Sequence, residues 1–236
     1  MASDERACVV VPALDEEAGI AAVVAGFRAR PEVERVLVVD NGSRDRTAER
    51  ARAAGAEVRA EARPGYGSAL RAGLEHALHT GARRLVLVEA DDTFDPADVG
   101  RLLEPLASHD LVLGSRHGSG ALPRHQELGN LIVARLVSGL WPRGAIALTD
   151  VGCTYRALTA AAWERLRTRV TASGPEFSPQ MICAAFAQPL AVREVRVAHR
   201  ARAGGSSKHT GDLGALTRTA LRMLRTIGAE RMRGPG

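Results

Sequence analysis

Four carboxylates crowd the end of one apolar run in this chain. Residues 85–96 read LVLVEADDTFDP, in which the acidic residues are Glu89, Asp91, Asp92 and Asp95. Asp95 followed by Pro96 is typical of a helix start, with the aspartate as N-cap and the proline as the first helical residue. That interpretation leaves Glu89 and Asp91 unexplained, because neighbouring carboxylates repel one another unless positive charge lies between them. A hard divalent cation, held by one or two carboxylates and by substrate phosphate oxygens, would supply that charge.

The alternation of apolar runs with amphipathic stretches predicts how these carboxylates are positioned. We expect strands over 7–13, 33–40, 57–60, 84–89 and 110–115, and helices over 18–30, 44–54, 67–80 and 97–106. Strands that alternate with helices predict an α/β fold with a mostly parallel sheet and helices on both faces. Ligands of such sheets bind beyond the carboxyl ends of the strands. Polar segments follow four of these strands (PALDEE, DNGSRDRT, EADDTFDP and GSRHGSG), so we expect one site at that edge of the sheet.

Length and composition indicate a globular chain. With 236 residues, 45% of them hydrophobic, it can bury a substantial core. The acidic start SDER and the lack of an apolar run of about 18 residues predict neither a signal peptide nor a membrane span. The widely spaced Cys8, Cys153 and Cys183 predict reduced, inert thiols, as in a cytosolic protein.

The positive charge is concentrated at the end of the chain. The net charge of the whole chain is +5. The segment after residue 189 contains nine arginines and one lysine but only three acidic residues. This segment is therefore expected to bind anions. Nucleic acid is disfavoured as the partner, because aromatic residues make up only 3% of the chain and leave little for base stacking.

Taken together, the motifs resemble family 2 glycosyltransferases, in particular the dolichyl-phosphate mannose synthases and bacterial polyprenyl-phosphate sugar transferases. The matching segments follow the family's order across residues 7–210: VVVPALDEE, VLVVDNGSRDRT, RPGYGSALRAG, VEADDTFDP, LVLGSR, LGN, TDVGCTYRAL and GGSSK. The resemblance implies the glycosyltransferase A fold. It also implies a nucleotide-sugar-binding half over 1–115 and an acceptor-binding half of the same domain over 116–210, followed by a basic amphipathic helix over 211–236.

For the donor side, the resemblance implies nucleotide-sugar contacts from Pro12, Glu16, Asp40, Arg63, Gly67 and Glu89. The resemblance implies that Asp91 binds Mg²⁺ or Mn²⁺ on the donor diphosphate. Asp92 and Asp95 are expected to surround this site without binding the ion directly. The family pattern is Asp-Ala-Asp, and Glu89 departs from it by one methylene, which alters metal preference or moves the contact to the sugar. The alternatives are a solvated helix start at PALDEE and a helix cap at Ser43. RPGYGSALRAG lacks the third glycine of a dinucleotide fingerprint, and we expect its helix N-terminus to contact the nucleotide instead.

For the acceptor side, the residues expected to contact phosphate are Arg116, Arg124, Arg202, Ser206 and Lys208. Asp150 is the first candidate for a catalytic carboxylate and Glu176 the second; a structural hydrogen bond to the following turn is the alternative for Asp150. Related sequences carry an acid where this chain has Gln180. A phosphate acceptor is already anionic near neutral pH and needs little help from a base, whereas a hydroxyl acceptor needs one.

Two segments have the character of membrane-surface helices. LGNLIVARLVSGLW (128–141) is nearly continuous in apolar residues, and the helix expected after Asp212 combines spaced leucines with a basic face of Arg218, Arg222, Arg225, Arg231 and Arg233. The alternative is packing on the core or against a second copy in a homodimer. We expect a cytoplasmic protein that is peripheral to the inner face of the membrane.

The function predicted is a metal-dependent inverting transferase that moves sugar from a UDP- or GDP-sugar to a polyprenyl phosphate. One alternative is a soluble natural-product or carrier-bound acceptor. Another, nucleotidyl transfer, is disfavoured because PALDEE is acidic where that class has a glycine-rich basic loop. A non-catalytic surface-binding protein with a decayed site is the third, and Glu89 and Gln180 keep it open.

Overall fold

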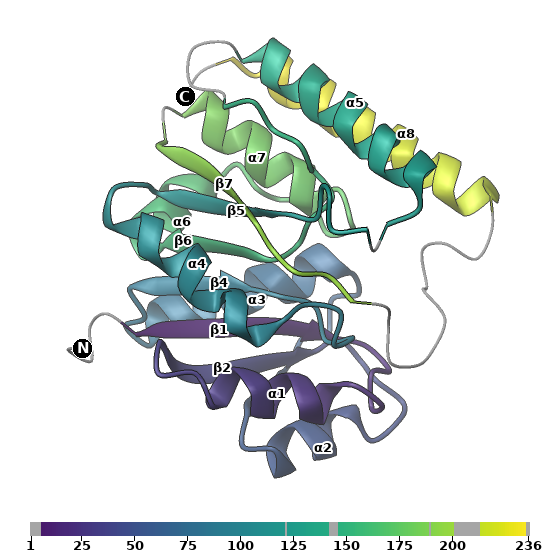
Figure 1. The fold of residues 1–236 in the computed structure, drawn as a ribbon. Helices are drawn as coiled ribbons and strands as arrows, with labels where there is room; N and C mark the ends of the chain where they lie inside the picture. The colour runs from purple at the N-terminus through teal and green to yellow at the C-terminus, as the bar shows by residue number, and fades with distance from the viewer. Residues whose placement is uncertain (1–5, 121, 142–145, 189, 201–212, 235–236) are drawn as a thin grey trace.

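The structure is a computed structural model that describes residues 6–120, 122–141, 146–188, 190–200 and 213–234. Seven strands form its central sheet in the order β3-β2-β1-β4-β6-β5-β7 (Figure 1). The strands are β1 (Ala7–Ala13), β2 (Val33–Asp40), β3 (Glu57–Ala60), β4 (Arg84–Leu87), β5 (Leu111–Ser115), β6 (Arg156–Thr159) and β7 (Val192–Arg196). The pairs β4·β6 and β5·β6 are antiparallel, and the other pairs are parallel. The predicted mostly parallel α/β sheet is confirmed.

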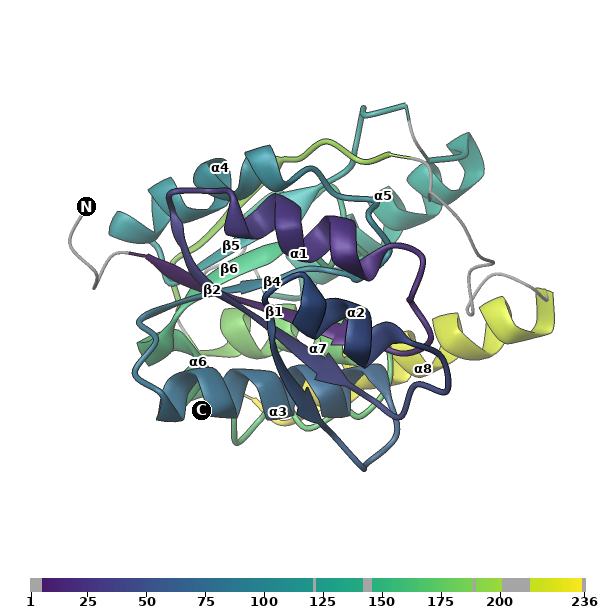
Figure 2. The same cartoon turned by 90° about the horizontal axis from the view of Figure 1, so that it is seen from below.

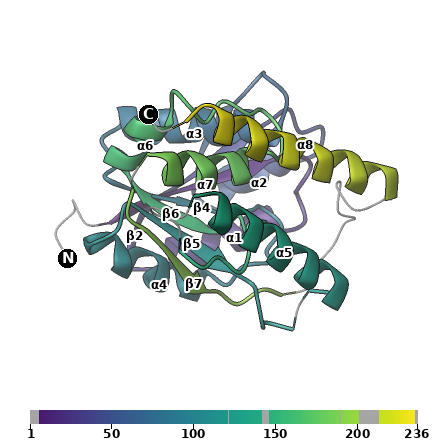
Figure 3. The same cartoon turned by 90° about the horizontal axis from the view of Figure 1, so that it is seen from above.

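Helices cover both faces of the sheet, as Figure 2 shows. One face carries α1 (Ile20–Arg28), α2 (Thr47–Ala53) and α4 (Val99–Leu103), and the other carries α3 (Tyr66–His79), α6 (Ala160–Leu166) and α7 (Phe177–Ala187). The helices α5 (Arg124–Leu140) and α8 (Leu213–Met232) run along the outside of the molecule near α7 (Figure 3). α3 lies close to the sheet because Gly73 has no Cβ, which would come within 2.4 Å of Val10 Cγ1.

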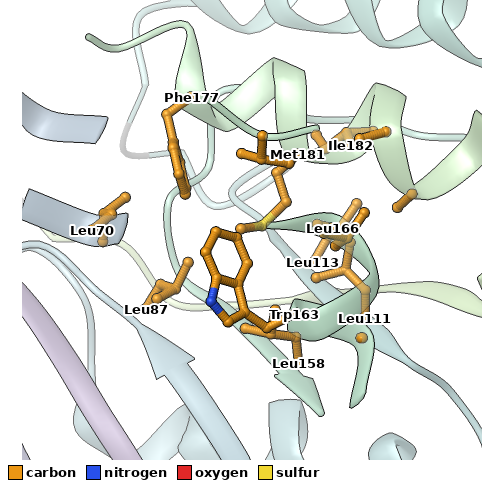
Figure 4. Packing of buried hydrophobic residues seen from close by; sticks show 14 of the residues in the cluster. Leu70, Leu87, Leu111, Leu113, Leu158, Trp163, Leu166, Phe177, Met181 and Ile182 are labelled. Carbon is orange, nitrogen blue, oxygen red and sulfur yellow. The ribbon is translucent and has the colours of Figure 1, made fainter. Parts of the chain in front are cut away.

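The central strand β1 is apolar throughout because both of its faces are covered. In β1, Val9 and Val11 pack with α1 and α4, whereas Cys8 and Val10 pack with α3 and α7. Trp163 is fully buried on the same face of the sheet as Cys8 and Val10 (Figure 4), as expected for a core residue. Its ring centroid lies 6.4 Å from that of Phe177. All three cysteines are buried and free, and burial raises the pKa of the Cys153 and Cys183 thiols to about 12.

Two predicted elements differ from the observed ones. The strand predicted over 84–89 ends at Leu87, so Glu89 lies in the loop that follows. The helix predicted over 97–106 is broken into a 3₁₀ turn (Pro96–Asp98), α4 and a second 3₁₀ turn (Glu104–Ala107). Pro105 has no N–H to donate, and this interrupts the α-helical pattern. Within the described ranges, every helix is too short or too polar to cross a bilayer.

Candidate active site

A cavity of about 580 Å³ lies at the carboxyl ends of β1, β2 and β4. Its walls come from the loops after these strands, the start of α3, the segment 173–176 and one residue of α8, Arg222. The predicted site edge is therefore where the structure has its cavity. Of the predicted donor contacts, Pro12, Glu16 and Glu89 line it, as does the predicted metal ligand Asp91.

Asn41 holds two sides of the cavity together. Its Nδ2 donates to the carbonyls of Glu61 (3.0 Å) and Arg63 (2.8 Å), and its Oδ1 accepts from Gly65 N (2.7 Å). Gly65 has a φ of 119°, which a side chain rarely tolerates. The end of β2 thereby fixes the loop that leads into α3. Arg63 projects outward, with its side chain 72% exposed and paired with Glu61.

The loop after β1 is bonded to the loop after β2. Asp15, at a φ of 50°, donates its N–H to Ser43 Oγ (3.0 Å), and Glu16 N donates to Thr47 Oγ1 (2.8 Å). Ser43 N in turn donates to Asp40 Oδ1 (3.1 Å). Glu16 is thus held at the cavity wall, whereas Asp40 supports the loop just before the lining residue Asn41.

The N-terminus of α3 is already engaged by protein groups. The N–H groups of Gly67 (2.7 Å) and Ser68 (3.2 Å) both donate to the carbonyl of Ser173. Gly67 also permits a close approach, since a Cβ there would lie 2.2 Å from Ala172 O. These two amides therefore serve to join α3 to the segment 173–176 rather than lying open to an anion.

The acidic loop after β4 separates into two kinds of carboxylate. Glu89 and Asp91 line the cavity, and Thr93 orients Asp91 by donating its N–H (3.2 Å) and hydroxyl (2.7 Å) to Oδ1. Asp95 accepts from Ala97 N (2.9 Å), which confirms it as the N-cap before Pro96, and it also pairs with Arg200.

The carboxylates that line the cavity fit a divalent metal ion that keeps most of its water ligands. Over the described residues there is no group of three or more His, Cys, Asp or Glu side chains arranged to hold a metal. The carboxylates of Glu89 and Asp91 share one cavity with room for a diphosphate. Mg²⁺ is commonly bound in this way, by one or two carboxylates, waters and substrate phosphates.

Asp150 and Arg116 form a buried forked ion pair. Arg116 Nε lies 2.8 Å from Asp150 Oδ2 and Nη2 lies 3.1 Å from Oδ1, while Asp150 is 2% exposed. Burial alone would raise the pKa of Asp150, but the hydrogen bonds and charge of Arg116 outweigh it and lower that pKa. Gly152 N also donates to Oδ1 (2.9 Å), so the structural hydrogen bond to the following turn is present.

Glu194 on β7 holds the backbone around this pair. Its carboxylate accepts from the N–H groups of Thr149 (3.0 Å) and Asp150 (3.1 Å). Asp150 and Arg116 are therefore held together as one rigid unit at the end of β5. The catalytic role predicted for Asp150 and the phosphate contact predicted for Arg116 stay predictions.

Glu176, the residue just before α7, and Gln180, within α7, have different surroundings. Glu176 lines the cavity, and its Oε2 is buried without a hydrogen-bond partner among the described residues. Gln180 is 5% exposed and bonded to the backbone of residues 171 and 172. Of the two predicted catalytic carboxylates, Glu176 is the one that faces the cavity.

The remaining predicted acceptor contacts fall in different places. Arg124 is exposed at the first position of α5. Arg202, Ser206 and Lys208 lie outside the described residues. The sequence did not single out Arg222 as a cavity residue, because its spacing places it only on the basic side of a helix.

His199 is a second residue that the motifs did not indicate. It packs against Phe94, with ring centroids 5.2 Å apart, and its Nδ1 has no hydrogen-bond partner among the described residues. Burial, then the charge of Arg116, lower the pKa of His199 and thereby favour the neutral imidazole. A histidine without a family motif around it carries no signal in a single sequence.

Comparison with known proteins supplies the class. Residues 8–161 match the family model described as glycosyl transferase family 2. The chain is 31% identical over 163 residues to glycosyltransferase AglJ of Haloferax volcanii, covering 67% of this chain and about half (52%) of that relative's length. It is 28% identical over 219 residues to polyprenol monophosphomannose synthase of Mycolicibacterium smegmatis, covering 88% of this chain and 82% of the relative.

A solved structure has the same fold. It is glucosyl-3-phosphoglycerate synthase from Mycobacterium tuberculosis in complex with Mn²⁺, UDP-glucose and phosphoglyceric acid. The TM-score is 0.76 at 25% identity, over 96% of this chain and 80% of the other. The fold is thus the one implied by the sequence motifs.

Proposed function

This chain belongs to glycosyl transferase family 2 and is a glycosyltransferase, and from that premise we propose that it transfers a sugar from a UDP- or GDP-sugar to a polyprenyl phosphate. The observation that carries the proposal is the cavity at the carboxyl ends of β1, β2 and β4, which is lined by the carboxylates of Glu89, Asp91 and Glu176. The relative from Mycolicibacterium smegmatis is a polyprenol monophosphomannose synthase, which supports the choice of acceptor.

The donor occupies the cavity in this proposal. Pro12, Glu16 and Glu89 contact the nucleotide sugar, and Asp91 binds Mg²⁺ or Mn²⁺ together with the donor diphosphate oxygens. When bound, the ion offsets the negative charge that develops on the leaving diphosphate. Residues 1–115 supply these groups, and residues 116–210 supply the acceptor side of the same domain.

The chemistry is a single displacement. An oxygen of the acceptor phosphate attacks the anomeric carbon and forms a new C–O bond, while the bond from that carbon to the diphosphate oxygen breaks. The electron pair leaves with the nucleoside diphosphate, and the anomeric configuration inverts. Because a phosphate monoester has its second pKa near about 6, the attacking oxygen is already anionic. Glu176 then serves to orient the sugar, and the ion pair between Asp150 and Arg116 keeps the acceptor side in place.

A membrane surface supplies the lipid acceptor in this proposal. Among the described side chains of α5 and α8, the exposed large apolar ones are Leu128, Ile132, Leu136, Leu221, Leu224 and Met232. Both helices lie on the outside of the molecule (Figures 1 and 3), where an apolar face beside basic residues suits the interface of an anionic bilayer. We place the protein at the cytoplasmic face of that membrane.

The test is nucleoside diphosphate release from UDP- and GDP-sugars with Mg²⁺ or Mn²⁺. Each reaction is run alone, with farnesyl phosphate, and with 3-phosphoglycerate as a soluble phosphorylated acceptor. We expect release to rise with farnesyl phosphate, to need the metal, and to disappear in Asp91→Ala but not in Glu75→Gln, a surface control on α3. Stimulation by 3-phosphoglycerate instead would move the acceptor to the soluble class. No release with any donor would favour the non-catalytic alternative.

A further inference from the structure

Charge is unevenly distributed in the cavity. Its described lining includes four acidic residues, Glu16, Glu89, Asp91 and Glu176, and one basic residue, Arg222 of α8. A transfer between a diphosphate sugar and a phosphate acceptor brings two anionic groups into this chamber. A divalent ion offsets the charge of the first, so the second requires a cation from the protein.

The other arginines near the strand ends have partners already. Two guanidinium nitrogens of Arg116 donate to Asp150, and Arg63 pairs with Glu61 and projects into solvent. Arg222 has no hydrogen bond or ion pair to any other described residue. It lines the cavity from α8, whereas the residues expected to contact the donor come from the first half of the chain.

The second half of α8 fixes the position of Arg222. Ile227 is 2% exposed in the hydrophobic core, and Glu230 is 1% exposed. Arg169 Nε lies 2.7 Å from Glu230 Oε2, and Gln180 Nε2 donates to Oε1 over 3.1 Å. A helix anchored in this way holds Arg222 at the cavity without further contacts.

Two exposed leucines of α8 lie close to Arg222 in the chain and, three residues apart, share one side of the helix. Leu221 is 48% exposed and Leu224 is 44% exposed. A guanidinium that faces the cavity beside leucines that face outward matches a ligand with an anionic head and a hydrocarbon tail.

We propose that Arg222 binds the phosphate of the acceptor and that Leu221 and Leu224 contact its hydrocarbon chain. This inference rests on the proposed transfer to a phosphate acceptor and names the residue that recognises it. A soluble phosphomonoester shares the phosphate chemistry but not the tail, so the two sources are separable by the leucines.

The kinetic test compares Arg222→Ala and Arg222→Lys with Arg165→Ala, an exposed arginine of α6 outside the cavity lining. With farnesyl phosphate as acceptor, Arg222→Ala is expected to raise the acceptor KM about 10- to 100-fold, the range for one charged hydrogen-bonded contact, and more than it changes the donor KM. Arg222→Lys should recover part of the loss, and Arg165→Ala should stay within about twofold of wild type. A larger effect on the donor KM than on the acceptor KM would overturn the assignment.

A binding experiment keeps the inference testable without turnover. Farnesyl phosphate and inorganic phosphate are titrated calorimetrically into the full chain and into the same variants, with thermal melts to verify folding. Weaker binding of both ligands in Arg222→Ala, and of farnesyl phosphate alone in Leu221→Ser/Leu224→Ser, is expected. Failure of the proposed function would appear as no turnover with these binding differences intact. Equal binding by wild type and Arg222→Ala would overturn the inference itself.

Discussion

Gln180 connects α7 to α8 through Glu230. Its Nε2 donates to Glu230 Oε1 over 3.1 Å, while its Oε1 accepts from the backbone N–H groups of Thr171 (2.9 Å) and Ala172 (2.8 Å). A glutamine can donate and accept at once, and an ionised carboxylate can only accept. Gln180 therefore attaches α8 to α7, and this structural role accounts for a glutamine at the position.

Gln180→Glu should destabilise the fold. The new carboxylate would face Glu230 at hydrogen-bond distance with no proton to donate, which we expect to cost about 1–3 kcal/mol in the free energy of unfolding. Like charges raise the folded-state pKa of such a pair, so the variant should regain stability as the pH falls below that pKa and lose it as the pH rises. Urea denaturation at pH 5 and pH 8 measures both effects.

Gln188→Glu is the matched control for that experiment. Gln188 Nε2 donates to Arg165 O at an exposed position at the end of α7, so the same change should cost less than about 0.5 kcal/mol. Equal losses in the two variants, or a loss in Gln180→Glu that is the same at both pH values, would show that repulsion from Glu230 is not the cause.

Removing Asp150 should be costly because it leaves Arg116 buried without a partner. We expect Asp150→Ala to lose about 3–5 kcal/mol of stability, against less than about 1 kcal/mol for Glu75→Ala, which breaks the exposed pair of Glu75 with Arg167. The folded-state pKa of Asp150 is lowered, so its stabilisation is present above the unfolded pKa of about 3.9 and is lost as the pH falls through the folded value. In denaturation curves from pH 7 down to pH 3, the difference in stability between wild type and Asp150→Ala should therefore begin to shrink as the pH falls below about 4 and should keep shrinking down to the folded pKa. Parallel curves would contradict this account.

Local patterns predicted the first half of the fold well because β1 and the second half of β2 are continuous apolar runs. β1, β2 and β3 have the predicted bounds, and the polar strand ends do meet at one edge. Long-range pairings were beyond these patterns: β6 inserts antiparallel between β4 and β5, although it follows β5 in the chain.

The same limit applies to the site. Glu89 and Asp91 were found from their own spacing, whereas the cavity position of Arg222 depends on how Glu230 attaches α8 to Arg169 and Gln180. Such contacts between residues about 50 positions apart leave no local signal in the sequence.

Glu89→Asp should change the preference between Mg²⁺ and Mn²⁺. The side chain lines the cavity next to Asp91, and shortening it by one methylene withdraws the carboxylate by about a bond length from any ion or sugar it meets. We expect the ratio of activities with the two ions to change by about 3- to 10-fold, with Glu89→Gln separating charge from length. Metal titrations of nucleoside diphosphate release measure the ratio. An unchanged ratio in both variants would place Glu89 on the sugar or the nucleotide instead of near the metal.

The outward side of α5 should bind an anionic bilayer. Leu128, Ile132 and Leu136 recur every four residues and are 59%, 60% and 47% exposed, while Ala134 and Val137 on the inward side are buried. This apolar face is wider than packing on the core requires, since the inward residues already supply that packing. The helix runs along the outside of the molecule (Figure 3), and an exposed apolar face of this kind suits the interface of a bilayer.

Ile132→Glu should therefore weaken membrane binding without unfolding the protein. Withdrawing one large apolar side chain from the bilayer interface, and adding a charge that anionic lipid repels, should lower the partition coefficient about tenfold or more. Ala107→Glu introduces the same charge at an exposed position in the turn after α4 and should change it little. Co-sedimentation with phosphatidylglycerol vesicles measures the partition, and thermal melts verify folding. If both variants bind as wild type does, α5 does not face the bilayer, and a homodimer contact, visible by sedimentation velocity, becomes the explanation for its exposed leucines.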